Sequence, residues 1–126
     1  MVKLVAREAE TDALTTWLGE HPIRITSILG KVEVLRAARR AARATDDDAV
    51  FVQASAVVAA VSIASVTDAI ADRAAVVEPL LLRSLDAVHL ATAVLAGPLE
   101  AFVVYDARLA DAVRSAGIRV VQPGRR

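Results

Sequence analysis

The stretch that decides the fold is the tract Leu85–Ala93, LDAVHLATA, with the run Phe102–Tyr105, FVVY, that ends on Asp106. The tract has the apolar pattern of a buried helix and carries Asp86 near its start. The run predicts a buried strand with a carboxylate directly after it. Open α/β sheets place their functional sites at the carboxyl ends of their strands. The stretch therefore predicts an α/β fold with acidic side chains at that edge of the sheet.

A third acid, Glu33, lies inside another apolar helical segment, Lys31–Ala37, KVEVLRA. Mg²⁺ and Mn²⁺ prefer carboxylate and water oxygens as ligands. Three acids in apolar surroundings, Glu33, Asp86 and Asp106, therefore indicate a divalent-metal site.

The rest of the chain alternates between helical and extended patterns. We expect helices over residues 2–20, 27–44, 48–60, 67–77, 84–95 and 107–116. The first of these is expected to break near residues 10–12. We expect strands over residues 23–26, 60–65, 101–105 and 119–121. Such alternation is typical of a parallel sheet covered by helices on both faces.

Two expectations concern the ends and faces of these helices. Ser27 is placed to cap the helix that follows it, and Gly117 is a natural stop for the helix before it. The core stripe of the helix after Ser27 is expected to consist of Ile28, Val32 and Leu35.

Composition limits the classes of function. The 126 residues are enough for one domain, and 56% hydrophobic residues are enough for a packed core. Fifteen basic and fifteen acidic residues balance, so any nucleic-acid contact must come from a local basic patch. No cysteine is present, which excludes disulfides and thiolate chemistry. The early charges at the amino terminus do not resemble a secretion signal, and the uncharged stretch 49–67 is interrupted by polar residues, so we expect a cytoplasmic protein.

The segments Ser84–Ala93 and Val103–Leu109 resemble the carboxyl half of a VapC-type PIN domain, the ribonuclease toxin of a type II toxin–antitoxin pair. Upstream, Thr26–Ala37 resembles the second strand of that family and the helix that carries its glutamate, and Val2–Val5 resembles its first helix. The resemblance implies one PIN-like domain over residues 1–126, with a parallel sheet between helices. It also implies a metal-dependent endoribonuclease that is inhibited by an antitoxin.

One feature departs from this family. Its members begin with a short strand that ends in an Asp-Thr-Ser-Ala type sequence, directly before the helix that starts here at Val2. We therefore expect a longer protein, with that strand and its aspartate upstream of Met1, or else a shortened and inactive member.

The resemblance assigns roles to the three acids. Asp86 is expected to ligate Mg²⁺ or Mn²⁺ directly, while Glu33 and Asp106 hold the ion through water or orient the nucleophile. Each acid also has a structural alternative. Asp86, or Ser84 beside it, could cap its helix, and Asp106 could cap the helix that follows it. His89, one turn after Asp86, is expected to be a packed or hydrogen-bonded helix residue rather than a general base.

The alternative for Glu33 is an ion pair with Arg36 or Arg40 on the same helix. These two arginines belong to a basic stripe that also includes Arg39 and Arg43. The stripe could contact RNA phosphates, contact an acidic segment of an antitoxin, or be only a solvated helix face.

The expected partners are an RNA substrate, a cognate antitoxin and a second copy of the chain. For the homodimer we expect exposed apolar area either around Leu14, Trp17 and Leu18 or on the alanine-rich helix after Asp48. The alternative to the enzyme is a degenerate PIN module that binds an antitoxin and itself without cutting RNA.

Overall fold

The computed structural model describes residues 10–125, which form two compact units. One unit comprises residues 10–64 with 123–125, and the other comprises residues 65–122. The segment expected to resemble the first helix of the family, Val2–Val5, lies outside the described residues. The single domain over residues 1–126 stays a prediction.

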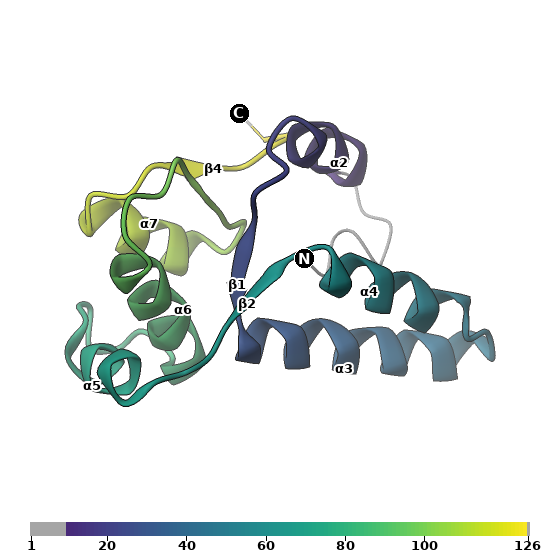
Figure 1. The fold of residues 1–126 in the computed structure, drawn as a ribbon, viewed down its shortest axis with the longest axis horizontal. Coiled ribbons are helices and arrows are strands. Elements are labelled where there is room, and N and C mark those ends of the chain that lie inside the picture. The colour runs from purple at the N-terminus through teal and green to yellow at the C-terminus, as the bar shows by residue number, and fades with distance from the viewer. Residues whose placement is uncertain (1–9, 126) are drawn as a thin grey trace. The chain divides into compact units, whose positions relative to one another are not determined.

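In the first unit, a helical hairpin connects two parallel strands. Its elements are α2 (Thr11–Gly19), β1 (Ile25–Ser27), α3 (Ile28–Thr45), α4 (Ala49–Ala59) and β2 (Ser62–Ala64). Strand β1 pairs parallel with β2, with Ile25 opposite Ser62. Parallel neighbours need a long crossover connection, and α3 and α4 supply it, lying side by side and running in opposite directions (Figure 1).

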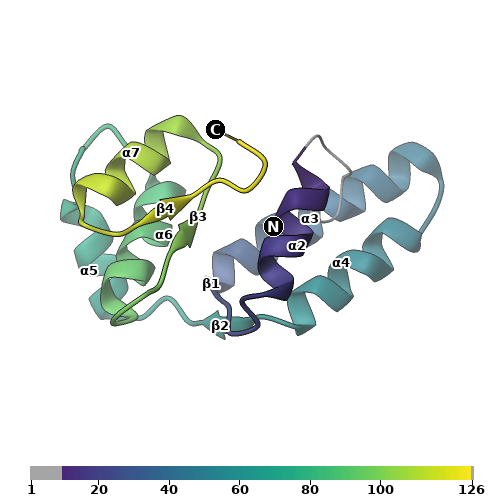
Figure 2. The ribbon, with the colours of Figure 1, turned by 90° about the horizontal axis from the view of Figure 1, so that it is seen from above.

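The second unit also contains two parallel strands, here connected by a single crossover helix. Its elements are α5 (Asp68–Val76), α6 (Ser84–Leu95), β3 (Phe102–Val103), α7 (Ala107–Ser115) and β4 (Val120–Val121). Strands β3 and β4 pair parallel and are connected by α7, and Figure 2 shows β4 running beside β3. The predicted α/β class with parallel strands is confirmed. Within residues 10–125 the four strands form two separate pairs.

The α3–α4 hairpin encloses the core of the first unit. The buried side chains that pack together there are small or β-branched: Val34, Ala38, Ala54 and Val58. Half-buried Leu35, Val50 and Phe51 pack against them. Small side chains let the two helices approach closely, so little apolar volume is needed to fill the space between them.

The predicted core stripe of α3 is mostly wrong. Ile28 and Val32 are 41% and 46% exposed, and Leu35 is only half-buried. The helix instead buries residues spaced four apart, namely Gly30, Val34, Ala38 and Ala42. The prediction placed the largest apolar side chains of α3 in the core. The face that contacts α4 instead carries small side chains, because the two helices pack closely.

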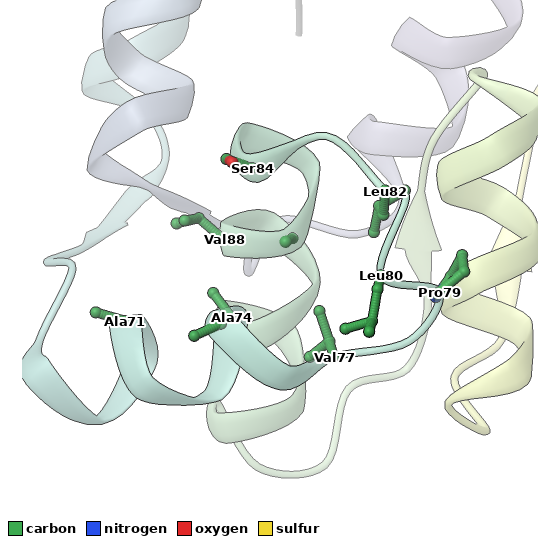
Figure 3. Close-up of a pocket in the computed structure, with 10 residues that line it drawn as sticks. Ala71, Ala74, Val77, Pro79, Leu80, Leu82, Ser84 and Val88 are labelled. Atoms are coloured by element: carbon green, nitrogen blue, oxygen red, sulfur yellow. The ribbon is translucent and has the colours of Figure 1, made fainter.

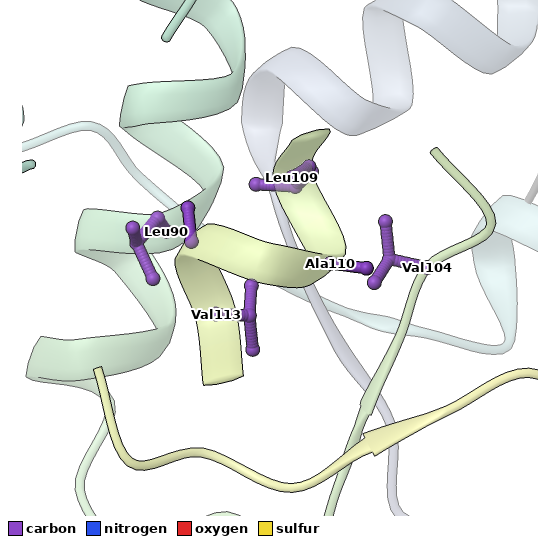
Figure 4. Close-up of a cluster of buried hydrophobic side chains, with 6 residues drawn as sticks. Leu90, Val104, Leu109, Ala110 and Val113 are labelled. Atoms are coloured by element: carbon purple, nitrogen blue, oxygen red, sulfur yellow. The ribbon is translucent and has the colours of Figure 1, made fainter. Parts of the chain in front are cut away.

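The core of the second unit joins α6, α7 and the segment after β3. Leu90 of α6 is 1% exposed and lies against Leu109, Ala110 and Val113 of α7, with Val104 on the other side of α7 (Figure 4). Half-buried side chains of both strands and both flanking loops complete the cluster. Leu90, one turn after Asp86, and Val104 and Leu109, which flank Asp106 in the sequence, thus belong to one apolar core.

The predicted helix ends are confirmed at two positions. The Ser27 hydroxyl accepts a hydrogen bond from the backbone N–H of Gly30, at 3.2 Å, and caps α3. Gly117, two residues after the end of α7, has a φ of +82°, a backbone conformation that residues other than glycine rarely adopt.

The uncharged stretch 49–67 forms α4 and β2. None of the helices within residues 10–125 is both long and apolar enough to cross a membrane.

Candidate active site

Asp86 lies in the first turn of α6, the helix that the tract Leu85–Ala93 predicts. The residue at the amino-terminal cap is Arg83, with extended backbone at φ −60° and ψ 146°, and no side chain caps this end. The expectation that Ser84 or Asp86 caps the helix is therefore wrong. The helix begins at Ser84 itself, so both residues already have helical backbone.

The Asp86 carboxylate is largely enclosed and faces a cation. Its side chain is 17% exposed, and its Oδ2 lies 3.5 Å from Nε of Arg83, whose own side chain is 78% exposed. The unpaired amides at the helix start also favour negative charge there. A half-enclosed carboxylate held in this way is suited to ligate a cation.

The pairing of Arg83 with this carboxylate was not predicted from the sequence. The signal was its position three residues before Asp86, a spacing that brings two side chains together at a helix start.

Asp106 follows β3 and the buried Val104, as the opening stretch predicts. Its backbone is extended, and its Oδ1 accepts a hydrogen bond from the N–H of Leu109 at 2.9 Å. The capping role left open for Asp106 is therefore confirmed. The side chain is exposed, so this role leaves its second oxygen accessible for a further contact.

Glu33 lies on α3, next to the buried Val34, and its side chain is exposed. It belongs to the first unit, whereas Asp86 and Asp106 belong to the second. Among residues 10–125, no three or more histidine and carboxylate side chains are grouped in a way that could hold a metal ion. The convergence of the three acids on one cleft stays a prediction.

His89 is half-buried on α6, one turn after Asp86. Its expected role as a packed or hydrogen-bonded helix residue, rather than a general base, stays a prediction.

A pocket of about 330 Å³ lies between α5, the start of α6 and the segment that connects them (Figure 3). The side chains that line it are aliphatic apart from that of Ser84, and Leu80, Leu82 and Val88 are among the larger ones. No titratable side chain is among those that line it.

Three ribonucleases of Mycobacterium tuberculosis are similar to this chain over almost its whole length. Ribonuclease VapC35 is 41% identical over 129 residues, and Ribonuclease VapC47 is 35% identical over 129 residues. Ribonuclease VapC46 is 35% identical over 131 residues. Each alignment covers 98% of this chain and 92% of the relative. No family model and no solved structure gives a significant match.

The likeness agrees with the α/β architecture with parallel strands. Identity of 35–41% over 98% of the chain shows common descent along both units, not in one motif. The chain belongs to the VapC ribonuclease family.

Proposed function

We propose that this protein is a metal-dependent endoribonuclease, the toxin of a toxin–antitoxin pair, that hydrolyses RNA phosphodiester bonds. The observation that carries the proposal is the likeness, over 98% of the chain, to proteins named as ribonucleases. The half-enclosed Asp86 carboxylate at the start of α6 supports it, because it is the kind of group that such chemistry needs.

The donor chemistry fits Mg²⁺ or Mn²⁺, since the candidate groups are carboxylates and the chain has no cysteine. In this proposal Asp86 ligates the ion directly, and Glu33 and Asp106 hold it through water or orient the nucleophile. A bound divalent ion supplies an activated water and stabilises charge that develops on the phosphate. The chain contributes the negative charge that places the ion, and Arg83 balances that charge at Asp86 when the ion is absent.

The proposal includes a cognate antitoxin, a homodimer and a cytoplasmic location. For the homodimer, the two surfaces named from the sequence now differ. Leu14 is 2% exposed and is not available to a partner, while Val52 of α4 is 66% exposed. The surface of α4 is therefore the better candidate for the contact between copies.

The test is an RNA cleavage assay with Mg²⁺, with Mn²⁺ and with a chelator, on the native chain and on Asp86→Asn. The exchange removes a charge at nearly constant volume, so the fold is retained. Removal of a metal ligand withdraws several kcal/mol of transition-state stabilisation, which corresponds to a loss of about a thousandfold in rate. Asp72→Asn, which alters an exposed aspartate on α5, is the matched control and keeps full activity.

Cleavage that persists in the chelator would refute the metal requirement. Cleavage that persists in Asp86→Asn would remove the residue on which the proposal depends. A native chain that binds an antitoxin but never cuts RNA would identify the non-cleaving module instead.

A further inference from the structure

The exposed face of α3 carries four arginines in one row. Arg36, Arg39, Arg40 and Arg43 are spaced three, four and seven residues from the first, so they share one side of the helix. This side lies away from the buried stripe of α3, which faces α4, and all four side chains are exposed. We call these four residues the arginine row.

The acidic side chains close to the row in the sequence lie at its two ends, with Glu33 before it and Asp46–Asp48 after it. Within the part of the chain that the structure describes, Arg36, Arg40 and Arg43 make no ion pair and no side-chain hydrogen bond. No acid occurs on α3 after Glu33, so the row is uninterrupted until the turn Asp46–Asp48. Three aspartates in that turn limit the row at its carboxyl end.

The remaining arginine of the row, Arg39, contacts an aromatic ring. The guanidinium carbon of Arg39 lies 4.3 Å from the centre of the Phe51 ring, in a cation–π contact between α3 and α4. Phe51 is half-buried and packs against the core of the hairpin. A guanidinium fixed on a rigid ring keeps its N–H donors and loses less freedom when it binds an anion.

The chemistry of the row selects its ligand. Guanidinium groups bind phosphate oxygens through paired N–H donors. Arginine is also enriched in protein–protein interfaces, but there it occurs together with aromatic side chains, and the centre of such an interface is depleted in charged residues overall. The row has four charges and no exposed aromatic residue, which matches a sequence-independent contact to a phosphate backbone.

We propose that the arginine row of α3 binds the phosphate backbone of the RNA substrate. The inference rests on the proposed function, because it takes RNA as the substrate. It explains how a chain with no net charge holds a polyanion, since the contact is local to one helix face. Contacts to the phosphate backbone do not require aromatic side chains that stack on bases, and only 3% of this chain is aromatic.

The experiment measures binding without cleavage. A fluorescein-labelled single-stranded RNA of mixed sequence is titrated with the full chain in a chelator, and fluorescence anisotropy gives Kd at several salt concentrations. The double variant Arg36→Gln with Arg40→Gln tests the row. Glutamine has nearly the helix propensity of arginine, and circular dichroism checks that the helices persist. The control, Arg73→Gln with Arg119→Gln, removes the same charge at exposed positions outside α3.

The row variant is expected to bind RNA several-fold more weakly, and the slope of log Kd against log salt falls by about 1.4, since each phosphate contact on a single strand contributes about 0.7. The control keeps the native slope. Equal weakening in both variants, or an unchanged affinity in the row variant, overturns the inference. An unchanged RNA affinity with weaker antitoxin binding assigns the row to the protein partner instead.

These outcomes are separable from those of the proposed function. Asp86→Asn is expected to lose cleavage and to bind RNA as the native chain does. If the native chain does not cut RNA but binds it through the row, RNA cleavage by this protein is refuted while RNA binding by the row is retained.

Discussion

At the scale of single residues, the Asp106 carboxylate combines a structural role with a proposed chemical one. Its Oδ1 caps α7 through the N–H of Leu109, and its exposed side chain leaves the other oxygen accessible. Asparagine caps a helix about as well as aspartate but carries no charge. Alanine has neither the capping oxygen nor the charge. Two substitutions at this position therefore separate the two roles.

We predict that Asp106→Ala lowers the free energy of unfolding by about 1 kcal/mol, because one amide at the start of α7 loses its acceptor. Asp106→Asn is expected to change stability much less while RNA cleavage falls. Urea denaturation and the cleavage assay measure the two effects. If Asp106→Asn retains full cleavage, Asp106 is a cap only.

At the scale of elements, α6 and α7 depend on a core that the structure locates in the second unit. Leu90 is 1% exposed and lies in the same cluster as Val113 of α7. By contrast, Leu81 in the loop before α6 is 95% exposed. The two leucines are nine residues apart but differ completely in burial, so they form a matched pair.

We predict that Leu90→Ala lowers the free energy of unfolding by about 2–5 kcal/mol, since it removes apolar contacts and leaves a cavity. Leu81→Ala is expected to change it by less than about 0.5 kcal/mol. Urea denaturation followed by far-ultraviolet circular dichroism measures both. A similar loss in the two variants would contradict the assignment of the core.

The helices and strands were largely predictable because their signals are local. Ser27 before an apolar segment, Gly117 after one and Asp106 after a β-branched run each act within a few residues. The buried face of α3 was not predictable in the same way. Val34 and Ala38 are buried against Ala54 and Val58 of α4, and α4 is a separate part of the sequence.

At the scale of the whole molecule, the open question is assembly. The expectation of a homodimer now points to α4, where Val52 is 66% exposed, since Leu14 is buried. Exposed aliphatic side chains on a helix surface are suited to contact between copies.

We predict that the native chain is a dimer by light scattering and that Val52→Glu raises the Kd of the dimer by at least about tenfold, because an unpaired charge in an apolar contact costs more than about 1.4 kcal/mol. Leu81→Glu places the same charge on an exposed leucine outside α2 and α4 and is expected to leave the dimer intact. A native chain that remains a monomer at high concentration, or an equal effect of both variants, argues against a dimer through α4.

The sequence by itself determined the α/β class, the order of the elements, the position of Asp86 at the start of α6 and the position of Asp106 after β3. These features depend on neighbours in the chain, through hydrophobic periodicity and local capping. Only the tertiary structure decided that Arg39 stacks on Phe51 and that small residues form the core stripe of α3. The physical reason is that rotamers and buried faces are selected by space and by contacts between segments, which periodicity along the chain does not contain.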